Sequence, residues 1–384
     1  MFTKNEKILG ELVFMERNAL KMETPLDYGK WACDTTMKIP ADQLPPVGGF
    51  HYHQGVCLMG MQKIYQLCEN EEYYRYIKSW VDSVLNEDGT PKRYKKEQFD
   101  DLMAGMLLFL LDERENDPKY RKCLDLLVSE INEWDRNEYG GFSHKRDVTP
   151  NQVWLDGLFM YGPLIVNYAK RYGKNPEFYD IVVEQLELMW EHMRDEKTGL
   201  LRHAWDPSLS GKWKDCAEPE TGLAPEAWGR AMGWYCVTLM EIYKDMPEKY
   251  RAGIAEKEKQ LIDSLISYQS KNGLWYQVID KGNEPGNWEE LSCSSLFVCA
   301  MCQAIEYGIL DDSYLKYAQA GYEGIVSMLE TNDDGDLLIG HVCIGTGVGT
   351  YQFYIERPTC INDLHGIGTF LYMIASAEKT LKNN

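Results

Sequence analysis

The feature that most constrains the fold is a recurrence of two kinds of helical segment along the chain. Six segments are apolar on most faces and carry small residues in their first turns, a pattern typical of fully buried helices. Six others are amphipathic, with one charged face each. The buried segments begin near Gly55, Phe99, Val153, Ala227, Leu291 and His365, and the amphipathic ones are the N-terminal segment and residues 71–87, 117–134, 176–193, 250–269 and 312–330.

This alternation predicts an all-α (α/α)6 barrel, in which an inner ring of six helices lies inside an outer ring of six. The mean repeat is 384/6 = 64 residues, enough for two helices and two connections. Since no linker divides the chain, we expect a single domain over residues 1–384. Each outer helix is followed by a glycine-containing turn and a long loop, so the long loops gather around the N-termini of the inner helices. These turns are at 27–31, 87–94, 138–144, 197–205, 271–278 and 333–342.

The composition restricts the ligand and the location. A formal net charge of −20 argues against nucleic acid or an anionic membrane as a partner. Six helix N-termini at one mouth favour a small anionic ligand instead. The 25 tyrosines and 11 tryptophans suit a carbohydrate cleft, although most of these rings must belong to the core. Because the N-terminus lacks the features of a signal peptide and the 11 cysteines read as reduced core residues, we expect a cytoplasmic protein, with no prediction of oligomeric state.

The candidate site is centred on Asp156, in the first turn of a predicted buried helix. The helix end stabilises its carboxylate, whereas the aromatic residues around it remove water, a conflict typical of a tunable acid/base group. The alternative interpretation is a helix-start aspartate that satisfies free backbone N–H groups. Other first turns and the loops before them bring more polar residues to the same mouth: Asp100, Asp101, Arg230, Ser292, His365, His51, Tyr52, His53, His144, His203 and Trp205.

Arg230 and the paired carboxylates indicate what such a mouth could do. An arginine at a helix N-terminus opposes the helix dipole and needs an anionic partner, either a nearby aspartate or a substrate carboxylate. A purely structural ion pair with an aspartate or Glu226 is the alternative. Two carboxylates on different helices form a hydrolytic arrangement, and their repulsion is expected to raise the pKa of one of them.

Several segments resemble a known family. WLDGLFM, HAWD, PEAWGRAMGWY and GTGVGTYQFYIERP, with FDDLMAG upstream, are similar to the unsaturated rhamnogalacturonyl hydrolases of glycoside hydrolase family 105. The resemblance to the unsaturated glucuronyl hydrolases of family 88 is more distant. It runs from about residue 27 to the C-terminus, and members of the family are (α/α)6 barrels.

The resemblance implies a role for each matching residue. Asp156 matches the general acid/base, and Asp101, in preference to Asp100, matches the assisting carboxylate. Arg230 and Trp228 match residues around the unsaturated uronic acid. The remaining pocket matches are His203, Trp205, His144 and Tyr52, and Trp154 is expected to line the pocket and bury Asp156.

The implied reaction is the release of a Δ4,5-unsaturated galacturonic acid from lyase-generated oligosaccharides, with galacturonyl-rhamnose as the expected unit. Asp156 would protonate C4 of the vinyl ether and then deprotonate a water that attacks C5. The resemblance implies no metal and no organic cofactor. The alternatives are a conventional inverting glycosidase or sugar epimerase on the same fold, and a non-catalytic carbohydrate-binding barrel.

Three further motifs are interpreted as structural or as pocket lining. Residues 332–336 resemble a calcium loop, but the ligand spacing fails and a turn is predicted. The glycines at 345, 347 and 349 are predicted to let a loop close over the barrel mouth. His51 and His53 are predicted to line the pocket and not to bind a metal.

Overall fold

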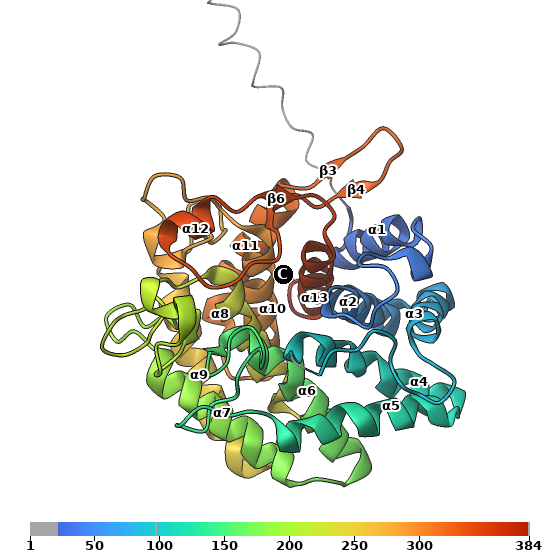
Figure 1. Cartoon of the computed structure of the whole chain (residues 1–384). Helices are drawn as coiled ribbons and strands as arrows, with labels where there is room; N and C mark the ends of the chain where they lie inside the picture. The colour runs from blue at the N-terminus through green and yellow to red at the C-terminus, as the bar shows by residue number, and fades with distance from the viewer. Residues whose placement is uncertain (1–21, 97, 383–384) are drawn as a thin grey trace, which may run out of the picture.

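The inner ring is a closed circle of helices. The structure, a computed structural model, describes residues 22–96 and 98–382. In that part of the chain each of six helical units contacts the next, and the last contacts the first (Figure 1). In order, they are α2 (Tyr52–Cys68), the 3-10 helix η2 (Phe99–Leu107) with α4 (Leu108–Glu115), α6 (Leu155–Tyr172), α8 (Gly229–Tyr243), α10 (Leu291–Glu306) and α13 (Leu364–Thr380).

The outer helices pack against this ring from outside. They are α1 (Pro25–Met37), α3 (Glu71–Val84), α5 (Pro118–Ser129), α7 (Glu177–Met193), α9 (Glu248–Ile266) and α11 (Leu315–Ser327). Each contacts at least one inner helix (Figure 1). The predicted (α/α)6 barrel is therefore confirmed.

The two rings differ in burial as their sequences predict. In α10 every residue from Leu291 to Ala304 is buried, whereas α9 buries only one stripe, from Ile254 to Leu265. Small residues let inner helices approach closely: a Cβ added to Gly60 of α2 would lie 2.7 Å from Cβ of Leu371 in α13. Close packing therefore requires glycine at such positions of the inner helices. The outer helices have one face in water, and their charged residues lie on that face.

The first outer helix was predicted wrongly. The N-terminal segment proposed for it lies outside the described residues, and residues 27–31, predicted as a turn, lie inside α1. Thr24 and Asp27 form a capping box that starts this helix, with Pro25 at its first position. Gly29 serves close packing and not a turn, since an added Cβ would lie 2.6 Å from Cδ1 of Ile64.

Short strands and turns occupy the connections. Three two-stranded antiparallel pairs join β1 (Val153–Trp154) to β2 (Ala204–Trp205), β3 (Glu330–Thr331) to β4 (Leu337–Leu338), and β5 (Val342–Cys343) to β6 (Thr359–Cys360). The predicted turn at 332–336 connects β3 to β4. The remaining elements are η1 (Ala41–Gln43), η3 (Glu130–Glu133), η4 (Gly211–Asp215), η5 (Ile279–Lys281), η6 (Asp312–Tyr314) and α12 (Tyr351–Ile355).

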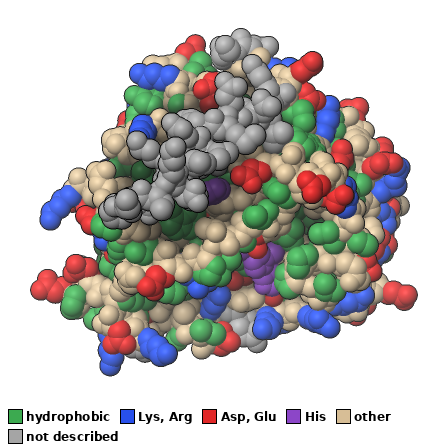
Figure 2. Space-filling model, turned by 90° about the horizontal axis from the view of Figure 1, so that it is seen from above, with side chains coloured by type: hydrophobic (Ala, Val, Ile, Leu, Met, Phe, Trp, Pro, Cys, Tyr) green, Lys and Arg blue, Asp and Glu red, His purple; other side chains and the backbone are tan. Residues whose placement is uncertain are grey.

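The surface and the cysteines agree with the composition. Figure 2 shows acidic and basic side chains interspersed over one face, without a continuous basic patch there. All 11 cysteines are free, and eight of them are buried. Among the described helices, none combines the length and apolar character needed to cross a bilayer.

Candidate active site

A cavity of about 360 Å³ lies where the inner helices begin. Its wall takes residues from the starts of α2, η2, α6, α8 and α13 and from the loop before α12. The structure therefore brings together most of the predicted site residues, whose roles remain predictions. Those on the wall are Tyr52, Asp100, His144, Trp154, Asp156, Trp228 and Arg230.

A close contact with His203, which is itself hydrogen-bonded to Tyr354, holds Asp156 in place. Its Oδ2 lies 3.2 Å from Nε2 of His203, and Nδ1 of His203 lies 2.6 Å from the hydroxyl of Tyr354. His203 is fully buried, directly behind the wall. Burial raises the pKa of Tyr354, so this hydroxyl keeps its proton and donates to Nδ1. The proton of the neutral imidazole is then on Nε2, the ring nitrogen nearer to Asp156.

The pKa of Asp156 is lowered, although an acid/base residue in a dry pocket was expected to have a raised pKa. Burial raises it, but His203, His144 and a backbone N–H together lower it by more, so the net pKa lies below the ordinary value of an aspartic acid. Burial also lowers the pKa of His203, so its imidazole is neutral at neutral pH. Repulsion between carboxylates was expected to raise the pKa of one of them. This does not happen at Asp156, because its contacts with His203, His144 and the backbone together outweigh burial.

Asp100 has a second histidine and, in addition, a lysine. Its Oδ1 lies 3.2 Å from Nε2 of His144, and its Oδ2 lies 3.4 Å from Nζ of Lys145. Burial raises the pKa of Asp100, but His144 and Lys145 hold it well below its usual range. His144 in turn stacks on the indole of Trp154, with ring centroids 4.3 Å apart. Asp100 is thus a fixed negative charge on the cavity wall.

Asp101 points elsewhere, contrary to the preference for it as the assisting residue at the cavity. It accepts hydrogen bonds from the backbone N–H of Lys95 (3.3 Å) and from Nε2 of Gln98 (3.2 Å), and it does not line the cavity. Neighbouring residues of a 3-10 helix point about 120° apart, so only one of the pair can face the cavity. Burial, with repulsion from Asp100, raises the pKa of Asp101 to about 7.

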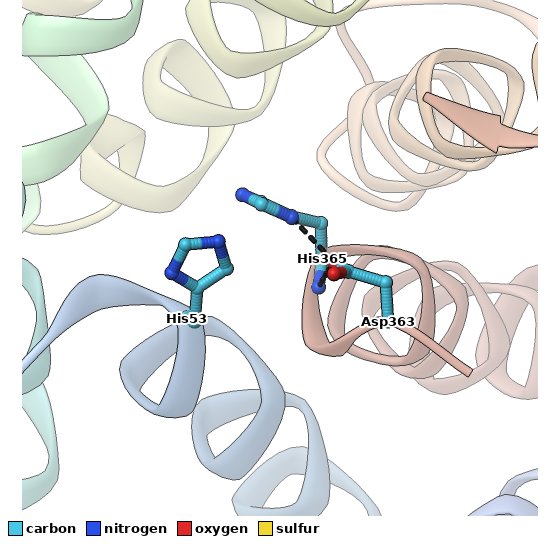
Figure 3. A group of neighbouring side chains, drawn as sticks. All are labelled: His53, Asp363 and His365. Atoms are coloured by element: carbon cyan, nitrogen blue, oxygen red, sulfur yellow. Dashed lines mark hydrogen bonds and ion pairs between the residues drawn. The ribbon is translucent and has the colours of Figure 1, made fainter. Parts of the chain in front are cut away.

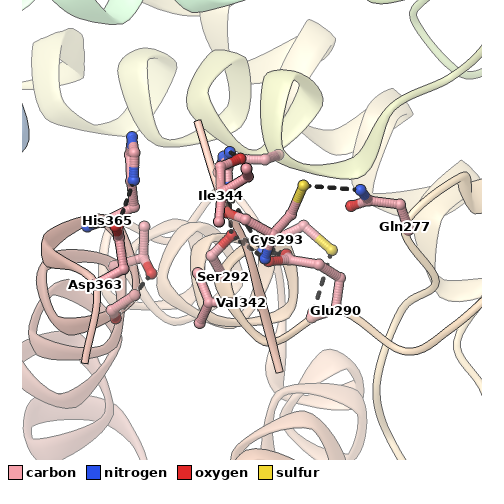
Figure 4. Close-up of polar contacts among 12 residues, drawn as sticks. Gln277, Glu290, Ser292, Cys293, Val342, Ile344, Asp363 and His365 are labelled. Atoms are coloured by element: carbon pink, nitrogen blue, oxygen red, sulfur yellow. Dashed lines mark hydrogen bonds and ion pairs between the residues drawn. The ribbon is translucent and has the colours of Figure 1, made fainter. Parts of the chain in front are cut away.

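Arg230 is anchored by backbone carbonyls and a buried carboxylate. It donates to the carbonyl oxygens of Cys343 (2.5 Å) and Ile344 (2.9 Å), and its Nη1 lies 3.8 Å from Oε1 of Glu290. Glu290 accepts hydrogen bonds from Ser292 and from the backbone of Cys343, which fixes this segment (Figure 4). The ionic partner is therefore Glu290. The alternative partner, Glu226, instead pairs with Lys281 at 2.6 Å.

Trp205 is not a wall residue of this cavity, contrary to its predicted place in the pocket. In β2 it pairs with Val153, whereas Ala204 pairs with Trp154. Successive residues of a strand face opposite sides, so Trp205 joins the main core and stacks on His192, with centroids 4.1 Å apart. Trp154 and Ala204 face the other side.

A histidine cluster orients Tyr52 at the opposite wall. Figure 3 shows His53 on α2 facing His365 and Asp363 at the start of α13, and one potential ligand atom from each lies within 4.8 Å of the others. These are the residues that could hold a metal ion, but their nitrogens have other partners. His365 bonds to Asp363 and, at 2.6 Å, to the hydroxyl of Tyr52, while His53 Nδ1 lies 2.8 Å from Nδ1 of His51.

Among the residues that the sequence analysis missed, four supply charges or hydrogen bonds that define the site. Lys145 follows His144 directly, and Tyr354 and Arg357 lie in the quoted segment GTGVGTYQFYIERP. Arg357 lines the cavity and places a second cation there. Glu290 caps α10 by accepting from the N–H of Cys293, so its position just before a predicted inner helix was the available signal.

A helical barrel with carboxylates, histidines, arginines and tryptophans around one mouth defines a carbohydrate-active enzyme of the acid/base type. Residues 29–381 match the model of Glycosyl Hydrolase Family 88. The chain belongs to this family and is a glycoside hydrolase.

Individual relatives agree. A glycoside hydrolase of family 105 from C. acetobutylicum superposes with a TM-score of 0.85 at 32% identity, covering 92% of this chain and 99% of that one. The unsaturated rhamnogalacturonyl hydrolase YesR of Bacillus subtilis is 26% identical, covering 85% of this chain and 89% of the relative. An unsaturated glucuronyl hydrolase from Bacillus sp. GL1, 14% identical with a TM-score of 0.68 over 93% and 96% of the two chains, shares the fold. The resemblance inferred from the sequence motifs is confirmed.

Proposed function

We propose that the enzyme removes the Δ4,5-unsaturated galacturonic acid residue from the non-reducing end of lyase-generated oligosaccharides by hydrating its double bond, with unsaturated galacturonyl-rhamnose as the preferred unit. The name of the relative YesR supports an unsaturated rhamnogalacturonyl substrate. The observation that carries the proposal is the division of charge at the cavity. One half-buried aspartate, Asp156, lies beside the neutral imidazole of His203, on the same cavity wall as the cations Arg230 and Arg357.

The two arginines suit the carboxylate at C6 of an unsaturated uronic acid. A guanidinium binds a carboxylate through paired N–H groups, and burial strengthens that interaction. Trp228, whose buried indole lies 4.7 Å from the guanidinium carbon of Arg230, helps to hold that cation in place. The substrate would thus be recognised by its charge.

Asp156 then acts first as a general acid and afterwards as a general base. Substrate brings a further negative charge into the cavity, which raises the pKa of Asp156 and favours its protonated form. The acid donates this proton to C4, and positive charge develops at C5 and the ring oxygen. A water attacks C5 and returns a proton to Asp156. The C5 hemiketal opens, and the resulting C1 hemiacetal expels the leaving sugar as its alcohol.

Asp100 would stabilise the positive charge that develops at C5. It stays ionised because His144 and Lys145 hold its pKa low. A fixed carboxylate in a partly dry cavity stabilises a cationic transition state more strongly than it would in water.

The test is to incubate the enzyme with unsaturated galacturonyl-rhamnose and follow the ultraviolet absorbance of the C4=C5 double bond. Hydration removes this absorbance, while free rhamnose appears in equal amount. A conventional inverting glycosidase would release rhamnose and leave the absorbance of the freed uronic acid intact. That result would contradict the proposal.

A further inference from the structure

A second hollow of about 790 Å³ continues from the active-site cavity. Three residues, Lys145, Trp154 and Gly347, line both spaces, so the two meet at the indole of Trp154. We call the second hollow the outer groove. Its other walls come from residues 147–152, from η4 and Cys216, and from Val348.

We propose that the outer groove binds the second and further leaving sugars, so that the preferred substrate is an unsaturated oligosaccharide longer than a disaccharide. This inference rests on the proposed function and goes beyond it. The non-reducing end must reach Asp156 inside the cavity, and the rest of the substrate then extends away from that residue. Past Trp154 the chain enters a space larger than the cavity itself.

The lining of the outer groove suits a sugar, which presents apolar C–H faces and a rim of hydroxyl groups. The indoles of Trp154 and Trp213 supply flat walls, and both are held rigidly. Nε1 of Trp154 donates to Oε1 of Gln152 at 3.1 Å, and Nε1 of Trp213 donates to the carbonyl of Gly222 at 2.9 Å. Rigid aromatic rings bind with little loss of conformational entropy.

Two further features are unexplained by the protein alone. Val148 at the edge of the groove is 71% exposed, a large apolar side chain in water. The hydroxyl of Thr149 is buried and has no hydrogen-bond partner among the described residues. A buried hydroxyl without a partner costs free energy, and a sugar hydroxyl in the groove would satisfy it.

The experiment compares kcat/KM for an unsaturated disaccharide and an unsaturated tetrasaccharide from the same lyase digest. We expect the tetrasaccharide to be preferred about tenfold, as one aromatic contact and one hydrogen bond would give. Thr149→Val, which removes only the hydroxyl, should lower kcat/KM for the tetrasaccharide about threefold and leave the disaccharide unchanged. Thr331→Val, at an exposed threonine of β3, is the matched control and should change neither.

Trp213→Ala should remove most of the preference for the tetrasaccharide. Because Trp213 is buried, its thermal unfolding is measured alongside, and retained disaccharide turnover shows that the active site is intact. Two results would overturn the proposal that the outer groove binds leaving sugars. One is equal kcat/KM for the two substrates in the wild-type enzyme, and the other is a tetrasaccharide rate unchanged by both Thr149→Val and Trp213→Ala. Failure to turn over either substrate would instead contradict the proposed function.

Discussion

Two aspartates stand at the starts of neighbouring inner helices, and each is paired with a histidine that lies against a tryptophan. Asp100 meets His144 at 3.2 Å, and Asp156 meets His203 at the same distance. The indoles are Trp154, 4.3 Å from His144, and Trp228, 4.5 Å from His203. Asp100 alone has a lysine, Lys145, at 3.4 Å. His144 and Lys145 together hold the pKa of Asp100 well below its usual range, whereas Asp156 has no ion pair with a lysine among the described residues.

The largest effect is expected for Asp156→Asn, which removes the proposed proton carrier. An amide cannot donate a proton to C4 or accept one from water, so kcat should fall by about 10³-fold or more. The fold should be unchanged, because the amide has nearly the same size and shape as the carboxylate beside His203. Loss of ultraviolet absorbance measures the rate, and circular dichroism checks the fold. If Asp156→Asn kept a large part of the wild-type rate, the two aspartates would have to exchange roles.

Asp100→Asn should cost less, about 10²-fold in kcat, because it removes a stabilising charge and not the proton carrier. Asp101→Asn is the matched control one residue along the chain. It should stay within about twofold of wild type, since Asp101 faces Lys95 and Gln98 and not the cavity. The same steady-state assay measures both variants. A slow Asp101→Asn beside a normal Asp100→Asn would restore the assignment first made from the sequence.

This pair of aspartates shows what a sequence can and cannot specify. Helical periodicity reports burial, so it predicted the inner helices, and their first turns predicted which segments meet at the mouth. The choice between Asp100 and Asp101 depends on the helix type. Both lie in η2, a 3-10 helix of nine residues, and the helix type sets which of the two side chains faces the cavity. The pKa of Asp156 depends on His203, which lies 47 positions away in sequence and is brought close only by the fold.

The same limit explains two other differences. Gly29 carries the same sequence signal as a turn glycine, although it packs α1 against Ile64. Trp205 lies in a motif shared with the family, yet the two-residue strand β2 turns it toward the core. In both cases the sequence shows the residue type, but whether Gly29 forms a turn or a packing contact, and whether Trp205 lines the pocket or the core, depends on the tertiary structure.

His203→Gln sharpens the comparison through pH. His203 lowers the pKa of Asp156, so its removal lets burial raise that pKa. The proton donor must be protonated for reaction, and kcat/KM therefore falls as pH rises through the pKa of Asp156 in the free enzyme. We expect this fall to move to higher pH in His203→Gln, with kcat lowered about tenfold by the loss of orientation.

His144→Gln is the control for this shift, because His144 pairs with Asp100 and contributes less to the pKa of Asp156 than His203 does. The pH profile of kcat/KM should move clearly more in His203→Gln than in His144→Gln. Equal shifts, or a shift of the His203→Gln profile to lower pH, would contradict the assignment of the proton carrier.

Glu258 in α9 extends the comparison to a carboxyl with no partner, and its effect is on stability alone. The residue is fully buried, and neither carboxyl oxygen has a hydrogen-bond partner among the described residues. Burial raises the pKa of Glu258 well above its usual value. In the unfolded chain the Glu258 carboxyl ionises at about pH 4.3, whereas in the folded protein it stays protonated to higher pH. The free energy of unfolding should therefore fall as pH rises from about 4.3 toward the raised pKa of the folded state.

Glu258→Gln removes this linkage while keeping the shape of the side chain. The variant should match wild type near pH 4 and exceed its free energy of unfolding by about 1 to 3 kcal/mol at pH 8, with unchanged kcat. Glu256→Gln, at an exposed position two residues earlier, should show no such pH-dependent gain. Urea unfolding at the two pH values measures the difference. A gain independent of pH would mean that Glu258 has a partner in the folded protein. Glu258 would then no longer show the effect of burial alone on a carboxyl pKa, with which Asp100 and Asp156 are compared.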